Sequence, residues 1–391
     1  MKKEKEEMKT ENNRLRAVTA GVMICFFLFG YCDSVRGATL TDVTSAFKVS
    51  YGVGGALMVV HYIGYCASSL FFGSMTGKIH RRTALIVSNV NIAAGIFIYT
   101  CAPNIYVFLI GILLIGFSLG LYEYAGNTTV ADIYPEEKRG KYTNLVAGMH
   151  GIGAIIGPAA FGLILRKGGD YKTAFMIILP VILAAVLLFL KTGYPKQAYL
   201  DDSPLRIKDI LRAMLIKKAG KYYALATLYI AAEAGIITWI TAFFVDEKGQ
   251  ALKQAALWLS LFFVFLTAGR FIGSMYVDRF GIRRVLIAHF SLSALCIILG
   301  VTLPGEAAVL LPLSGLFLSV IFPTLGAGIS VECHENTAVT MGAFFAFAAL
   351  GGAAGSWAIG LFSQILGTRA GIGSTAVICL AALLIVHKAV R

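Results

Sequence analysis

Apolar runs of about twenty residues, separated by short polar segments, follow one another along most of the chain. A helix needs roughly 20 predominantly apolar residues to cross the hydrocarbon core of a bilayer. The pattern therefore predicts an all-α membrane protein with twelve transmembrane helices. The expected spans are residues 17–37, 51–77, 84–101, 106–131, 142–165, 173–190, 223–245, 255–276, 284–303, 307–330, 338–361 and 370–387.

The longest polar stretch, residues 191–222, falls between the sixth and seventh expected spans and divides the chain in two. We expect residues 1–16 to be a tail, residues 17–190 and 223–391 to be two six-helix bundles, and residues 191–222 to link them. Within the linker, residues 207–218 form a basic amphipathic segment. Such a segment typically lies on lipid headgroups, and a regulatory site is the alternative.

The composition agrees with a chain that lies mostly in lipid. Of the 391 residues, 58% are hydrophobic and only 14% are charged, whereas soluble domains have roughly 25% charged residues. Most of the 34 Lys and Arg residues fall in segments that would share one side of the membrane. The positive-inside rule then puts both termini in the cytoplasm and predicts a multi-pass protein of the plasma membrane. The net charge of +13 is explained in this way, and we expect a lipid bilayer, not nucleic acid, as partner.

A similar element recurs after the second and the eighth expected spans: residues 73–82 and residues 273–284 both begin with Gly-Ser-Met and end in Arg-Arg. Two repeated halves are typical of transporters, with the substrate site between them. Clustered arginines at helix ends can form a lock that breaks when the halves move, or they can simply be positive-inside charge. The gating residues that we expect are Gly73, Arg81, Arg82, Asp278, Arg279 and Arg283.

Ionisable residues inside the expected spans are few, and each needs a reason because charge in lipid is costly. Asp33 and Arg36 share a face of the first span and form either a mutually neutralising pair or a site at the cavity mouth. Glu123 lies well inside the fourth span with no Lys or Arg within a turn, and Asn127 follows one turn later. A carboxyl that takes up and loses a proton as its surroundings change is what a proton-coupled carrier needs; a pair with Arg36 is the alternative.

Further candidates lie in the fifth and seventh spans. Glu233 is near the middle of the seventh span and either lines a cavity or pairs with Arg270. Trp239 follows six residues later, and carboxylates together with aromatic faces suit sugars. His150 is either a ligand-binding residue or a packing residue.

The repeated elements resemble the loop motif Gly-x-x-x-Asp-Arg-x-Gly-Arg-Arg of the major facilitator superfamily, and this resemblance implies its fold of two pseudo-symmetric six-helix bundles. Residues 123–127, 144–158, 229–239 and 322–324 resemble segments of the fucose/glucose–proton symporters and related sugar carriers. The likeness implies that Glu123 carries the proton, and that other polar and aromatic residues lie near the sugar. We expect Glu123 and Asp33 as proton-coupling residues and Arg36, Asn127, His150, Tyr229, Glu233 and Trp239 as substrate-binding residues.

Together these features predict a functional monomer that imports a small sugar or sugar-like solute, with a monosaccharide as the expected substrate, by proton symport and alternating access. A proton-coupled antiporter that exports a small organic solute or drug is the alternative, because residues 153–162 partly resemble the Gly-Pro motif of antiporters. We expect no enzyme activity, no metal and no cofactor besides the coupling proton; sodium stays open as the coupling ion. A receptor or accessory protein that does not transport finds no support in the sequence.

Overall fold

The computed structural model describes residues 2–74, 79–192, 207–273, 275–333 and 337–390. These residues form helices joined by short turns, and no strand occurs among them. Eleven helical segments in these ranges are long and apolar enough to cross a bilayer. The remaining expected span, residues 51–77, is helix α2 (Tyr51–Ser74), which is 24 residues long.

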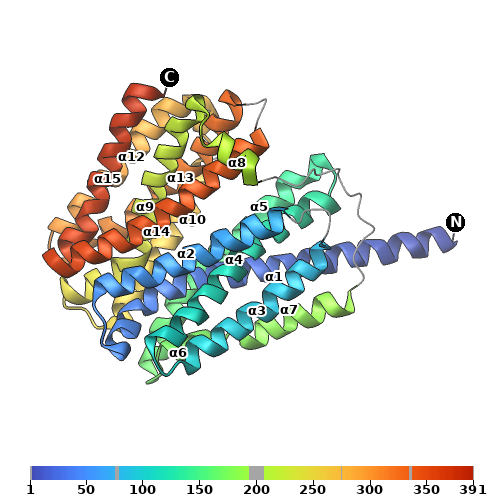
Figure 1. Ribbon diagram of the computed structural model, residues 1–391, viewed down its shortest axis with the longest axis horizontal. Helices are drawn as coiled ribbons and strands as arrows, with labels where there is room; N and C mark the ends of the chain where they lie inside the picture. The colour runs from blue at the N-terminus through green and yellow to red at the C-terminus, as the bar shows by residue number, and fades with distance from the viewer. Residues whose placement is uncertain (1, 75–78, 193–206, 274, 334–336, 391) are drawn as a thin grey trace.

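Within the described residues, the first half of the chain, which we call the N-terminal half, contains seven helices, and Figure 1 shows how they are arranged. Helix α1 packs along α5, while α4 packs between α2 and α3. The helices are α1 (Lys2–Phe47), α2 (Tyr51–Ser74), α3 (Arg81–Cys101), α4 (Ile105–Ile133), α5 (Glu136–Arg166), α6 (Tyr171–Met176) and α7 (Leu179–Lys191).

The C-terminal half repeats this arrangement: α9 packs along α14, and α13 packs between α10 and α12. The short helix α8 (Ile207–Ala213) precedes it and contacts α14. The remaining elements are α9 (Lys217–Asp246), α10 (Leu252–Gly273), α11 (Val277–Phe280), α12 (Ile282–Thr302), the 3-10 turn η1 (Gly305–Val309), α13 (Leu310–Glu332), α14 (Thr337–Leu366) and α15 (Thr368–Ala389).

Three details differ from the hydropathy pattern. Helix α1 runs from Lys2 to Phe47, through the expected tail and past the end of the expected span 17–37. The expected span 173–190 is broken between α6 and α7, and Pro180 stands in the first turn of α7. Proline has no N–H and crowds the preceding turn, so a helix restarts at it more easily than it runs through it. The expected amphipathic segment 207–218 ends as a helix at Ala213, and α9 begins at Lys217, earlier than the apolar run suggests.

The two halves meet along α2 and α14 and along α5 and α10. We call the end where α1 begins and α15 finishes the terminal end, and the opposite end, where α2 begins, the far end (Figure 1). Across the far end, the Tyr51 hydroxyl donates to Asp246 Oδ2 at 2.9 Å, and the Gly52 N–H donates to Gln364 Oε1 at 3.0 Å. Toward the terminal end the halves spread apart in Figure 1.

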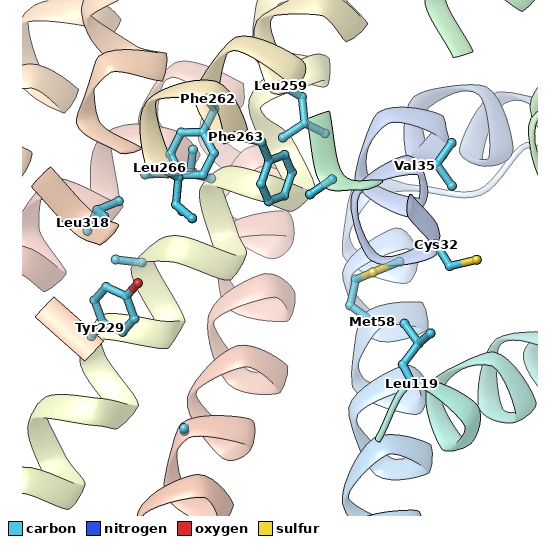
Figure 2. Close-up of a cluster of buried hydrophobic side chains, with 14 of the residues drawn as sticks. Cys32, Val35, Met58, Leu119, Tyr229, Leu259, Phe262, Phe263, Leu266 and Leu318 are labelled. Atoms are coloured by element: carbon cyan, nitrogen blue, oxygen red, sulfur yellow. The ribbon is translucent and has the colours of Figure 1, made fainter. Parts of the chain in front are cut away.

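Buried apolar side chains of both halves belong to one cluster, part of which Figure 2 shows. Their close packing makes the interior resist deformation. Side chains from the N-terminal half are Cys32, Val35, Met58 and Leu119, and those from the C-terminal half are Tyr229, Leu259, Phe262, Phe263, Leu266 and Leu318.

Each half is tied at its terminal end by an ion pair. Arg81 Nε of α3 lies 3.2 Å from Asp132 Oδ2 of α4, with the two side chains 8% and 6% exposed. Lys221 Nζ of α9 lies 2.7 Å from Glu332 Oε2 of α13. Both pairs join helices of the same half, so they stiffen each half and leave the halves free to move against each other.

We expect Asp132→Asn to lower the stability of the protein by about 3 kcal/mol, because it removes the carboxylate of a buried ion pair with Arg81. Thermal unfolding in one detergent measures the change. The control is Asp209→Asn, whose partner Arg212 is 81% exposed and 4.0 Å away, and it should leave the unfolding temperature unchanged. Equal effects of the two substitutions would contradict the structural role of the pair.

Candidate functional site

A cavity of about 200 Å³ lies between the two halves, about midway along the helices. Helices α1, α2 and α4 form one side, and α9, α10, α13 and α14 form the other. The cavity is closed from the far end by the contacts between the halves. Its lining consists of Phe29, Asp33, His61, Tyr62, Tyr65, Glu123, Tyr229, Ile230, Glu233, Ala234, Ile237, Arg270, Phe322, Phe345, Ala348 and Ala349.

Glu123 reaches the cavity from α4. One turn before it, Gly120 lies against α2, where an added Cβ would meet the Tyr65 carbonyl oxygen and the Ser68 hydroxyl. The close approach of the two helices leaves Glu123 on the face of α4 that borders the cavity. No described residue gives Glu123 a hydrogen bond or an ion pair, although the charges of Asp33 and Arg270 act on it. The carboxyl therefore has no fixed counter-charge.

Asp33 and Arg36 form an ion pair with each other, as their spacing of three residues on one helix permits. Arg36 Nη2 donates to Asp33 Oδ1 at 2.7 Å across one turn of α1. Asp33 lines the cavity, whereas Arg36 is only 7% exposed and lies outside the lining, with its guanidinium 5.9 Å from the centre of the Tyr62 ring. The Nε and Nη1 atoms of Arg36 have no hydrogen-bond partner among the described residues. In this geometry the charges of Asp33 and Arg36 neutralise each other, and Nε and Nη1 of Arg36 keep N–H groups that no described residue accepts.

Glu233 and Tyr229 lie one turn apart on α9, and both line the cavity. The Tyr229 hydroxyl donates to Glu233 Oε1 at 2.8 Å. The Tyr229 ring stacks on Phe322 of α13 with centroids 5.7 Å apart, which fixes its direction. Among the described residues Glu233 forms no ion pair with Arg270. Of the two alternatives for Glu233, the structure shows the cavity-lining one.

Arg270 of α10 is a cavity residue that the sequence suggested only as a partner for Glu233. The preceding residue, Gly269, faces α13, where an added Cβ would meet the Leu316 carbonyl oxygen and the Ser319 hydroxyl. Arg270 is therefore turned toward the cavity. It is exposed, and no described residue gives it a hydrogen bond or an ion pair. It shares the cavity lining with Glu123 and Glu233, a position that depends on how the helices of the two halves pack and that the sequence of α10 alone does not reveal.

Four expected ligands lie outside the cavity lining, and Arg36 is one of them. Asn127 is exposed one turn beyond Glu123 toward the terminal end. His150 of α5 packs edge-on against Phe29, with ring centroids 4.6 Å apart. Trp239 is fully buried at the far end. The structure thus brings together Asp33, Glu123, Tyr229 and Glu233, and it places the other four expected ligands outside the lining.

An aromatic wall completes the cavity, and sequence reasoning did not single it out. Phe29 and Tyr65 come from the N-terminal half, and Phe322 and Phe345 come from the C-terminal half. Aromatic residues occur on every face of these apolar helices, so no periodicity marks those that border a cavity. His61, also in the lining, is buried, and its Nδ1 has no partner among the described residues.

Residues 22–251 and 222–390 both match the sequence model of the Major Facilitator Superfamily, so the matches span nearly the whole chain. The chain belongs to the Major Facilitator Superfamily. The resemblance and the fold that the sequence predicted are confirmed. The protein is a multi-pass membrane transporter and not an enzyme.

Three relatives of this superfamily are informative. The L-fucose–proton symporter of Escherichia coli (strain K12) is 24% identical over 335 residues, which are 77% of this chain and 76% of the symporter. Its crystal structure in the outward conformation gives a TM-score of 0.66 over 97% of this chain and all of that one. The gentisate transporter of Corynebacterium glutamicum is 22% identical over 89% of this chain and 78% of its own length. A bacterial homologue of the human lysosomal transporter Spinster, inward-facing and occupied, is 14% identical and gives a TM-score of 0.79 over 95% of this chain and 96% of its own.

The superfamily motif arginines of the N-terminal half bond within that half. Arg81 pairs with Asp132, and Arg82 donates from Nε to the Phe189 carbonyl oxygen at 2.7 Å. His80 caps α3, because its Nδ1 accepts the Arg82 N–H at 3.2 Å. Burial, and then the charges of Arg82 and Arg81, lower the pKa of His80 and favour the neutral ring that accepts this bond.

The second motif shows the same tendency. Arg283 Nη2 donates to the His387 carbonyl oxygen of α15 at 3.4 Å, and the Arg279 guanidinium lies 5.9 Å from the centre of the Phe280 ring. The surroundings of Gly73 and the side chain of Asp278 lie outside what the structure describes. The gating role of all six residues stays a prediction.

We expect Arg36→Gln alone to destabilise the protein by about 3 kcal/mol, because the Asp33 carboxylate would be left uncompensated at the cavity wall. The double change Asp33→Asn with Arg36→Gln should recover part of that loss, since it removes both charges together. Thermal unfolding of the two single variants and the double variant measures this coupling. Losses that simply add would mean that the pair does not hold these residues in place.

Proposed function

We propose that this superfamily member is a proton symporter that imports a small, neutral, hydroxyl-rich solute, a monosaccharide or a close analogue. The observation that supports this most directly is the position of Glu123: it borders the cavity and has no hydrogen-bond or ion-pair partner among the described residues. A carboxyl in that situation can bind a proton in one state of the carrier and release it in another.

The charges around the cavity support coupling to one proton. Asp33, Glu123 and Glu233 supply three carboxylates, and Arg36 and Arg270 supply two guanidinium groups. When all are ionised, one negative charge is in excess, and a proton on Glu123 removes it. Moving net charge through a membrane is costly. The loaded carrier therefore changes conformation most easily when it holds one proton and an uncharged solute.

The remaining lining favours a sugar. Arg270 and Tyr62 offer donors, and Glu123 offers acceptors, for hydroxyl groups. Phe29, Phe322 and Phe345 offer apolar faces for the C–H surface of a sugar ring. A cavity of about 200 Å³ is smaller than the pockets that hold drug-sized ligands. The similarity to an L-fucose–proton symporter points in the same direction.

In the proposed cycle, the far end faces the outside and both termini lie in the cytoplasm of the cell, with the protein in the plasma membrane. Glu123 takes up a proton while the cavity is open to the outside, and the solute then binds between the aromatic walls. The halves rock, the far end closes, and the solute leaves toward the terminal end. Loss of the proton from Glu123 to the cytoplasm lets the empty carrier return. The protons are the only coupling ions the proposal requires, and a monomer suffices.

Glu123→Gln should abolish accumulation of solute against its gradient while sparing exchange of labelled for unlabelled solute, because the amide keeps hydrogen-bonding groups but cannot bind a proton. Uptake and counterflow in proteoliposomes with an imposed proton gradient measure the two activities. The matched control is Glu247→Gln, at the far end and outside the cavity, which should keep accumulation. A Glu123→Gln carrier that still concentrates its solute would overturn the assignment.

Direction and substrate are tested together in intact cells. A thermal-shift screen with neutral and acidic monosaccharides identifies solutes that stabilise the purified protein, and neutral ones should give the larger shifts. Addition of such a solute to energy-starved cells should make the medium more alkaline, because symport carries protons inward. Acidification of the medium would instead support the antiport alternative, and stabilisation only by acidic solutes would refute the neutral-solute proposal.

A further inference from the structure

The far-end seam, where the two halves touch, contains one large side chain. Trp239 of α9 is completely buried there, although it lies outside the cavity lining. Its ring packs on Tyr51 of α2, with centroids 5.1 Å apart and planes at 60°. Its Cη2 atom would lie 3.3 Å from a Cβ added to Gly54 of α2. Trp239 therefore projects from the C-terminal half onto the N-terminal half.

Trp239 is anchored in its own half. Its Nε1 donates to the Ser356 carbonyl oxygen of α14 at 2.8 Å, and the neighbouring Thr238 hydroxyl lies 3.2 Å from that of Ser356. Gly360, one turn further along α14, makes room for the ring, since an added Cβ would meet Trp239 Cζ2. When the halves separate, the indole therefore stays with α9 and α14 and leaves α2.

Two hydrogen bonds cross the seam next to this ring. Tyr51, which packs on the indole, also donates to Asp246 at the end of α9, and the adjacent Gly52 donates to Gln364 near the end of α14. The Trp239 ring and these two hydrogen bonds thus form one continuous contact between α2 on one side and α9 and α14 on the other. Opening of the far end must break all three contacts together.

We propose that Trp239 is the far-end gate: its docking onto Gly54 and Tyr51 seals the cavity from the far side, and its withdrawal opens it. The sequence resemblance implied a sugar ligand at this position, and the geometry gives the side chain a different task. The inference needs only that the two halves rock. It holds for symport or antiport and for any solute.

Gly54→Ala tests the gate, because the new methyl group would press against Trp239 Cη2 and disfavour the closed far end. Hydrogen–deuterium exchange of the purified full-length protein, without solute, should rise about fivefold in residues 51–58. Exchange in residues 138–148 should fall, since the same movement closes the terminal end. The control is Gly373→Ala on α15, where an added Cβ meets no atom within 4 Å; it should change neither segment.

A second variant separates the gate from a packing defect, because the new Cβ also comes within 2.9 Å of Thr44 Cγ2 in its own half. Trp239→Phe removes Cη2, so in that background Gly54→Ala should add no further exchange at the far end. An undiminished effect of Gly54→Ala in the Trp239→Phe background would overturn the proposal. So would faster exchange at residues 51–58 without slower exchange at residues 138–148. Neither outcome bears on the proton or the solute.

Discussion

The cost of charge inside a bilayer is the constraint on which this structure depends. Most charged groups in its interior meet that constraint with a partner of their own half: Asp33 has Arg36, and Glu233 has the Tyr229 hydroxyl. Glu123 and Arg270 are treated differently, since neither has a hydrogen bond or an ion pair to a described residue. They belong to opposite halves and border the same cavity. Movement of the halves therefore changes the electrostatic surroundings of Glu123 directly, and in the symport that we propose this is the physical link between proton binding and rocking.

Backbone-to-backbone packing occurs inside each half and also between the halves. Inside the N-terminal half, an added Cβ at Gly153 of α5 would meet the Phe27 carbonyl oxygen of α1, and across the halves one at Gly37 of α1 would meet the Ile237 carbonyl oxygen of α9. The hydrogen bonds of Tyr51 and Gly52 join the halves at the far end, and the Ser260 hydroxyl of α10 donates to the Ile155 carbonyl oxygen of α5 at 2.6 Å. If each half moves as a rigid body, the halves can separate at the far end and come together at the terminal end with little distortion of either half.

The sequence predicted the helices better than the site, for a physical reason. Hydropathy reports that a segment lies in lipid, and it located the long helices; only Pro180 broke one of them unexpectedly. Which face of a helix borders a cavity depends on neighbouring helices, so Glu123 and Glu233 were found by their charge alone. Arg270 looked like a partner for Glu233 until α10 was placed. Trp239 was expected beside the solute, but six residues along a helix are about 9 Å, which carries it past the cavity to the far end.

That distance along α9 has a mechanical consequence. Tyr229 and Glu233 border the cavity and Trp239 closes the far end, and all three are fixed to one unbroken helix. Since a helix transmits displacement along its axis, a solute that draws α9 toward α2 at the level of Glu233 also presses Trp239 onto Gly54. A solute that merely fills space without contacting α9 would not do so. In the proposed cycle, the polar contacts of α9 with the solute therefore also favour closure behind it, and this ties binding to the direction of transport without a separate signalling element.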